Sequence, residues 1–470
     1  MRTIISLTIL MLVISGVLMS SGQTAWAADH AGTFQLPEYE KFVLDNGLTV
    51  YLLEQHEVPL VYVSLVLPGG AIYDGTKYGL ASLTAEGLLF GTKNYTKNQI
   101  EDELDYIGAS YNISAAKEFV EISMSFVNKD QDLVFSILKD LVMNPTFNEQ
   151  EFDKHKKRLL VELEQAKESP RAVIRSYYDK FLFQEHEYGN PVGGTRATVD
   201  GITVDDLKAY YKSFYYPAGA AIAVTGDFKT AEMKKAVTRL LASWGSKGNA
   251  GSISDRSIPA YSKSRLLLVN KEDATETRFL IGGFGIKRSN PDYVAVQVIN
   301  TILGGRFTSW LNDELRVNRG LTYGAWSAFS PRKVSGSFFI SSFTRTETTI
   351  EAIDVAIEIL DKLHKEGVDE KTLLSAKNYV KGQYPPNYET AGDLASLLTD
   401  MFVYGFDESF INQFQENVDG LDVGKARQII GNYFPRGNLQ FVLIGKASDI
   451  RAEVAKYGDL TEKDIKAVGF

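Results

Sequence analysis

The sequence contains no cysteine among its 470 residues. This absence excludes disulfide bonds and thiolate metal ligands, whichever compartment the protein occupies. Histidine is scarce as well, and no two of its five copies lie within four residues of each other: His30, His56, His155, His186 and His364. The sequence therefore cannot place two imidazoles at the i, i+4 spacing that brings them together on one face of a helix.

A run of basic residues is also missing, and the formal net charge is −9. An acidic chain repels the phosphate backbone, so we expect no nucleic-acid partner. After residue 27 no apolar run is long enough to span a bilayer, which predicts no membrane span in that part of the chain.

The N-terminal segment differs from the rest, because it is apolar from Ile4 to Met19 and follows a single cation, Arg2. Ala25-Trp26-Ala27 supplies an A-x-A cleavage signal, so residues 1–27 are predicted to be a secretory signal peptide. An uncleaved membrane anchor is the alternative, but the run is shorter than the roughly 20 residues that a spanning helix needs. We therefore expect an exported protein of 443 residues, periplasmic or secreted.

Two distant stretches share the order of amphipathic helix, Pro/Gly turn and buried strand. They are ITVDDLKAYYKSFYYPAGAAIAVTGDF (202–228) and LDVGKARQIIGNYFPRGNLQFVLIGKA (421–447). Equivalent positions are separated by a constant 219 residues, as in Val204 and Val423, Phe214 and Tyr433, and Gly226 and Gly445. A shared order at a constant offset predicts a duplicated domain.

Between the two halves, residues 245–265 are rich in glycine and serine, which is typical of a linker. We place an N-terminal domain at 35–244, a linker at 245–263 and a C-terminal domain at 264–470. In each half short apolar strands alternate with helical patterns, so we predict an α/β sandwich. Each domain would hold a mixed, mostly antiparallel sheet with helices packed on one face.

Two long helical patterns follow the strands of the first half, DLVFSILKDLVMN (132–144) and EQEFDKHKKRLLVELEQAK (149–167). The second pattern ends before Pro170, as helices commonly do. Its charged stretch EFDKHKKRLL (151–160) is interpreted as a solvated helix face.

Four motifs occur in a fixed order along the chain. They are LDNGLTVYLLE (44–54), GLASLTAEGLLFGT (79–92), FQEHEYGNPVGGT (183–195) and ILGGRFTSWLNDELRVNRGLTYGAWSAF (302–329). In this order and spacing they resemble the insulinase–pitrilysin superfamily of inverted zinc peptidases, which includes the mitochondrial processing peptidase. The resemblance covers nearly all of the mature chain and implies two homologous domains that form half of a peptidase clamshell.

Active members of this family carry H-x-x-E-H on the first helix, where two imidazoles bind zinc and the glutamate acts as general base. Aligned on GLA and the closing GT, the histidine positions of this sequence are Ser82 and Glu86, and the base position is Ala85. The third ligand position falls on Glu162. Two carboxylates without an imidazole make a poor zinc site, so we expect no metal in this chain. A residual metal site at Glu86 and Glu162 is the alternative to a solvated or hydrogen-bonded pair.

The second half contains ELRVNRGLTYG, which places Arg316 and Tyr323 seven residues apart across a helix end capped by Gly320. In the family, the half without the zinc motif supplies such an arginine and tyrosine to the catalytic cavity, where they hold the substrate and stabilise the oxyanion. The resemblance implies this role for both residues, since a guanidinium and a phenol are hydrogen-bond donors. An ion-paired arginine and a buried core tyrosine are the alternative.

Gly304 and Gly305 precede this helix and would allow a substrate strand to approach the backbone closely, or form a tight turn. His186 lies in a segment that resembles the family's F-x-x-H-x-Y-G motif, and we interpret it as structural.

The resemblance and the degenerate motif together predict a non-catalytic subunit of an exported, heterodimeric zinc metallopeptidase that acts on peptides. Its partner would be a homologous chain that carries H-x-x-E-H and the zinc. The alternative is a peptidase-like binding or assembly module without a proteolytic role, because the family also contains core subunits of respiratory complexes. An enzyme with a non-standard site is disfavoured by the missing imidazoles.

Overall fold

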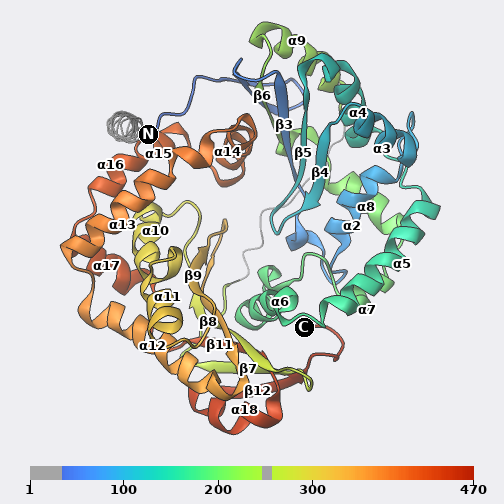
Figure 1. The fold of residues 1–470 in the computed structure, drawn as a ribbon. Coiled ribbons are helices and arrows are strands. Elements are labelled where there is room, and N and C mark those ends of the chain that lie inside the picture. Colours follow the sequence, from blue (N-terminus) through green and yellow to red (C-terminus); the bar gives the residue numbers. More distant parts are fainter. Residues whose placement is uncertain (1–33, 246–256) are drawn as a thin grey trace, which may run out of the picture.

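The computed structural model describes residues 34–245 and 257–470. The predicted signal peptide and part of the predicted linker lie outside these residues. Two six-stranded sheets organise the described chain, one built from each half, and Figure 1 shows them on opposite sides of the molecule. Within the described ranges, no helix has both the length and the apolar character that crossing a bilayer requires.

The two sheets have matching strand orders, β1-β2-β6-β3-β5-β4 and β12-β7-β11-β8-β10-β9. The first sheet consists of β1 (Glu40–Val43), β2 (Thr49–Glu54), β3 (Leu60–Pro68), β4 (Ser110–Ala115), β5 (Phe119–Val127) and β6 (Ala221–Gly226). The second consists of β7 (Arg265–Asn270), β8 (Glu276–Phe284), β9 (Ala325–Ser330), β10 (Ser337–Arg345), β11 (Gln440–Gly445) and β12 (Asp459–Asp464). In the first sheet only β2 and β6 are parallel, and in the second β7 is parallel to β11 and β12. The predicted α/β class with mixed, mostly antiparallel sheets is confirmed.

Helices cover the sheets in both halves. The first half contributes α2 (Leu80–Gly87), α3 (Lys97–Tyr106), α4 (Gln131–Met143), α5 (Glu149–Ala166), α6 (Pro170–Phe183), α7 (Arg196–Asp200), α8 (Val204–Phe214) and α9 (Thr230–Leu241). The second contributes α10 (Tyr293–Asn300), α11 (Trp310–Asn312), α12 (Thr349–Glu366), α13 (Glu370–Gln383), α14 (Ala391–Tyr404), α15 (Glu408–Asn412), α16 (Phe414–Asp419), α17 (Val423–Tyr433) and α18 (Ala447–Val454). Two wider π-helical turns, η6 (Thr301–Gly305) and η7 (Asp313–Asn318), flank α11.

The internal repeat predicted from the sequence is confirmed residue by residue. Helix α8 begins at Val204 and α17 at Val423, and strand β6 begins at Ala221 and β11 at Gln440. Both pairs keep the offset of 219 residues, and both strands are fully buried in the middle of their sheets. The apolar runs AIAVTG and QFVLIG therefore occupy equivalent central positions, as continuous hydrophobic strands do when both faces are covered.

Each sheet is covered on its second face by a helix from the other half. Helix α6 of the first half packs on β8 and β11, and α14 of the second half packs on β3 and β6 (Figure 1). The Tyr178 hydroxyl of α6 donates to the Phe338 carbonyl at 2.7 Å, and the Thr225 hydroxyl of β6 donates to the Ala391 carbonyl of α14 at 2.5 Å. From the sequence we expected helices on one face only, and this exchange of helices, which joins the two halves, was not predicted.

Candidate functional site

The segment GLASLTAEG forms helix α2, as predicted. A buried carboxylate holds the start of this helix, because Asp74 accepts the backbone N–H groups of Gly79 and Ala81, both at 2.8 Å. Burial raises the pKa of Asp74 to about 7, although these two N–H groups and the Lys117 ammonium oppose that shift. Helix α2 is thus fixed by its own preceding loop and needs no metal for its position.

On α2, the positions that the zinc motif would occupy contact one another. The Ser82 hydroxyl donates to one carboxylate oxygen of Glu86 at 3.1 Å, and Ala85 is fully buried in the core of the first half. The second carboxylate oxygen of Glu86 lies in contact with Nε2 of His155 on α5.

His155 was missed by the sequence analysis, which assigned its stretch to a solvated helix face. Its side chain is only 18% exposed, and its Nδ1 accepts a hydrogen bond from the Arg158 guanidinium at 2.9 Å. Because Nδ1 accepts, the proton of the imidazole is on Nε2. The sequence did contain a signal for this position of His155. His155 lies seven residues before Glu162, the predicted third ligand position, and residues at this spacing lie on the same face of one helix.

Glu162, at the predicted third ligand position, lies on α5 with its carboxylate 3.6 Å from Nε of Arg158. The polar groups therefore form a chain from Ser82 through Glu86, His155 and Arg158 to Glu162. One imidazole, two carboxylates and a guanidinium do not fit zinc, because Arg158 brings a fixed positive charge into contact with both His155 and Glu162. In the part of the chain that the structure describes, no group of three or more His, Cys, Asp or Glu side chains could hold a metal ion.

Arg316 and Tyr323 lie at the rim of the second sheet and line one cavity of about 480 Å³, together with Gly320 and residues of β8 and β10. The π-helical turn η7 carries Arg316, whose guanidinium lies 4.7 Å from the centre of the Phe307 ring. Gly320 follows the turn with φ of 62°, as the predicted helix cap requires.

The Tyr323 side chain points away from the protein core. It is 84% exposed, and its ring stacks on Phe343 with 6.5 Å between ring centres. Within residues 34–245 and 257–470, the Tyr323 hydroxyl makes no hydrogen bond and Arg316 forms no ion pair. The alternative of a buried core tyrosine and an ion-paired arginine is therefore wrong for this pair.

The two glycines differ in their surroundings. A Cβ at Gly304 would lie 2.3 Å from the backbone nitrogen of Ser327 in β9, so the close packing of η6 on β9 by itself requires glycine there. Gly305 is exposed and borders a different cavity, whose other lining residues include Asn300 and Phe329. The predicted contact with a substrate stays a prediction for both positions.

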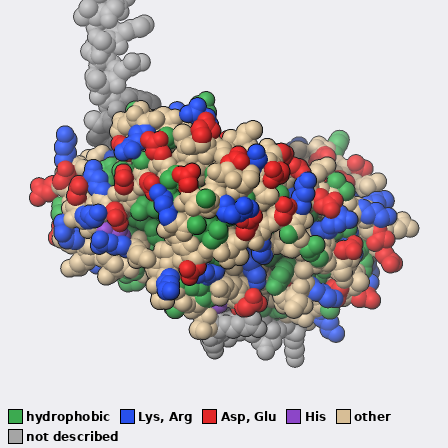
Figure 2. All heavy atoms as spheres, turned by 90° about the horizontal axis from the view of Figure 1, so that it is seen from below, with side chains coloured by type: hydrophobic (Ala, Val, Ile, Leu, Met, Phe, Trp, Pro, Cys, Tyr) green, Lys and Arg blue, Asp and Glu red, His purple; other side chains and the backbone are tan. Residues whose placement is uncertain are grey.

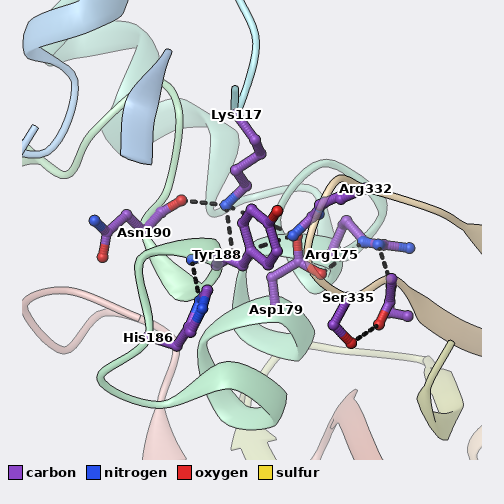
Figure 3. A network of polar contacts seen from close by, with 10 residues as sticks. Lys117, Arg175, Asp179, His186, Tyr188, Asn190, Arg332 and Ser335 are labelled. Atoms are coloured by element: carbon purple, nitrogen blue, oxygen red, sulfur yellow. Dashed lines mark hydrogen bonds and ion pairs between the residues drawn. The ribbon is translucent and has the colours of Figure 1, made fainter. Parts of the chain in front are cut away.

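Tyr323 also borders a second, larger cavity of about 620 Å³ between α6 and the second sheet, which we call the α6 cavity. At its base a buried carboxylate, Asp179 of α6, binds Nη2 of Arg332 at 2.9 Å and Nε of Arg175 at 3.0 Å (Figure 3). Lys117 approaches the same carboxylate to 3.9 Å. Burial opposes the charge of Asp179, but the three cations outweigh it, so the pKa of Asp179 lies below its ordinary value.

This charge cluster joins the halves. Lys117, from the loop between β4 and β5, donates to the carbonyl oxygens of Tyr188 and Asn190 (Figure 3). The Tyr188 hydroxyl donates to Glu118. Burial lowers the pKa of Lys117 to about 7, although the Asp179 carboxylate opposes that shift. His186 is buried, and its Nδ1 accepts the Tyr188 N–H at 3.1 Å, a contact that agrees with the structural role predicted for it.

Two family models match consecutive parts of the chain. One is described as insulinase, peptidase family M16, and matches residues 49–196, and the other is described as the peptidase M16 inactive domain and matches residues 201–380. The chain belongs to the M16 family. Ser82, Ala85 and Glu86 in place of H-x-x-E-H set it apart from the active M16 peptidases.

Curated M16 relatives and solved M16 structures resemble the chain over most of its length. The "non-peptidase homolog YmxG" of Helicobacter pylori is 25% identical over 372 residues, 77% of this chain and 84% of the relative. The "uncharacterized zinc protease YmxG" of Bacillus subtilis is 23% identical over 358 residues, 76% of this chain and 86% of the relative. A peptidase M16 inactive domain from Pseudomonas fluorescens superposes with a TM-score of 0.82 at 24% identity, covering 87% of this chain and 98% of that one. This last likeness confirms the fold.

Proposed function

We propose that this M16 chain is the non-catalytic subunit of an exported, heterodimeric zinc metallopeptidase. Its partner would be a homologous chain that carries H-x-x-E-H and holds the zinc. The observation that supports the proposal most is the contrast between the two halves. Ser82 contacts Glu86, and Glu86 is connected to Glu162 through the side chains of His155 and Arg158. Arg316 and Tyr323, by contrast, are exposed around one cavity.

In the assembled peptidase, the partner's zinc would supply the activated water, and this chain would supply hydrogen-bond donors. The Tyr323 hydroxyl and the Arg316 guanidinium would bind the scissile carbonyl and the peptide backbone beside it. Donors that are fixed in place before the reaction stabilise the oxyanion of the tetrahedral intermediate at little reorganisation cost. An exposed phenol and a guanidinium suit this task, because among the described residues neither must first give up a hydrogen bond or an ion pair.

Metal content tests the first half of the proposal. We expect the purified chain alone to hold no stoichiometric zinc and to cleave no peptide, because Ser82, Ala85 and Glu86 replace the two ligands and the general base. Elemental analysis after dialysis against zinc, with a peptide cleavage assay on the same sample, measures both. Glu164→Ala is the matched control for Glu162→Ala, since Glu164 lies on the same helix and pairs with Arg196. One tightly held zinc per chain that is lost in Glu162→Ala and kept in Glu164→Ala would contradict the proposal.

A further inference from the structure

The α6 cavity has an unusual charge for this protein. Four arginines and one aspartate line it: Arg171, Arg175, Arg278, Arg332 and Asp179. The chain as a whole is acidic, with a formal charge of −9, and Figure 2 shows acidic and basic side chains interspersed on the face that it displays. The local excess of positive charge is therefore a property of the cavity and not of the protein's composition.

Only two of these four arginines contact a carboxylate within the described residues. Asp179 binds Arg175 and Arg332, as described above. Arg171 and Arg278 form no ion pair among the described residues. Arg171 is exposed at the start of α6, and Arg278 projects from β8 with its guanidinium 4.7 Å from the centre of the Phe343 ring. Two cations without a carboxylate partner thus face one cavity.

Arg278 gives the stronger indication that the cavity attracts an anion, because its side chain is half-buried. Burial lowers its pKa, and the nearby Arg171 lowers it further, whereas Glu276 alone opposes the shift. A partly desolvated cation beside a second cation gains more from an incoming anion than a fully solvated one does.

The rest of the lining suits a peptide. Ile174, Leu280 and Phe339 provide apolar surface, Ser341 and Ser342 provide hydroxyl groups, and Trp326 is 47% exposed. Tyr323 borders both the α6 cavity and the cavity that it lines together with Arg316. A peptide whose carbonyl lies at Tyr323 would therefore place neighbouring side chains in the α6 cavity.

We propose that the α6 cavity binds acidic side chains of the peptide substrate next to the scissile bond, so that this subunit selects acidic peptides for the complex. The inference rests on the proposed function for the position of the scissile bond. The binding site itself belongs to this chain alone, and it can be tested without the partner. Arg171 and Arg278 would pair with glutamate or aspartate carboxylates, while Trp326 and Phe343 contact their methylene groups.

The test is a titration of the purified mature chain with three labelled peptides of one sequence, in which the same positions hold glutamate, glutamine or lysine. Fluorescence anisotropy measures binding, and all peptides carry an amidated C-terminus, so that only side-chain carboxylates differ. We expect the glutamate peptide to bind about tenfold more tightly than the glutamine peptide, and the lysine peptide to bind most weakly. Added salt should weaken the binding of the glutamate peptide more than that of the glutamine peptide.

Arg171→Gln/Arg278→Gln should abolish the difference between the glutamate and glutamine peptides. Lys235→Gln/Arg239→Gln removes the same number of charges from the exposed face of α9 and should leave the difference intact. If the first variant fails to fold, Arg171→Gln alone, at an exposed position, should still reduce the difference. The inference is overturned if the glutamate and glutamine peptides bind equally, if only a free C-terminus restores binding, or if both double variants lose the same amount.

The outcome is separable from the proposed function. If no catalytic partner exists, selective binding of the glutamate peptide would still establish the site on this chain. If the complex exists and depends on Tyr323, equal binding of the three peptides would remove the acidic preference and leave the subunit model in place.

Discussion

Tyr323→Phe is expected to lower the kcat of the assembled peptidase roughly 10²-fold, or about 3 kcal/mol, with little change in KM. The substitution removes the donor that we propose binds the oxyanion and leaves the ring on Phe343 in place. A donor that acts only in the transition state affects kcat, whereas uniform binding would affect KM. The measurement is steady-state peptide cleavage by the complex, isolated through a tag on this chain.

Two comparisons make this result specific. Tyr106→Phe removes the hydroxyl of a tyrosine that is 89% exposed on α3, distant in sequence from the cavity, and should change neither constant. Arg316→Ala should damage both kcat and KM, because the guanidinium is also proposed to hold the peptide backbone in the ground state. If Tyr323→Phe complexes assemble normally and cleave at the wild-type rate, Tyr323 has no catalytic role and the assembly-module interpretation gains support.

Asp179→Asn should destabilise the fold by about 3–5 kcal/mol. The amide keeps the shape of the side chain, but it leaves the buried guanidinium of Arg332, and with it Arg175 and Lys117, without their shared counter-charge. Since these cations come from both halves, the loss should loosen the contact between α6 and the β9–β10 hairpin. Urea unfolding followed by circular dichroism measures the free energy of unfolding.

Surface charge provides the control for Asp179. Asp419 pairs with Lys381 at 2.7 Å but is 58% exposed, so Asp419→Asn should cost less than about 1 kcal/mol.

The pH dependence of stability gives a second test of the role of Asp179. Because the folded-state pKa of Asp179 is lowered, its contribution is complete above the unfolded value of 3.8 and is lost as the pH falls through the folded value. Wild-type stability should therefore fall more steeply in acid than that of Asp179→Asn, and parallel acid profiles with equal midpoints would refute the cluster's role.

Much of the fold was accessible from the sequence, because local patterns determine it. The offset of 219 residues identified α8 with α17 and β6 with β11 to the residue, since their helix start signals and apolar strands are themselves repeated. The helix predicted for the GLAS segment is α2, whereas the alignment of the degenerate motif on GLA and GT stays a prediction.

The exchange of α6 and α14 could not be read from the sequence. An amphipathic helix shows which of its faces is apolar, but it does not show which of two similar sheets will cover that face. The pairing became visible only through contacts such as Tyr178 with Phe338 and Thr225 with Ala391, which join residues more than 150 positions apart.

The interpretation of the motif helix was limited for a related reason. From the sequence, imidazoles were sought only at the two motif positions of α2, Ser82 and Glu86, whereas His155 comes from α5 and lies beside Glu86. Nor could the sequence show that Tyr323 is exposed, or that Arg171 and Arg278 lack carboxylate partners among the described residues, because exposure and ion pairing depend on tertiary contacts.

The central claim is that this chain completes an active site whose zinc belongs to another chain. Its most direct test combines the purified mature chain with the purified H-x-x-E-H chain and compares peptide cleavage by each alone and by the mixture, with sedimentation of the same samples. The account predicts a one-to-one complex that cleaves peptides, and little or no cleavage by either chain alone. Separate species at micromolar concentration, or an H-x-x-E-H chain that cleaves equally fast without this one, would contradict it.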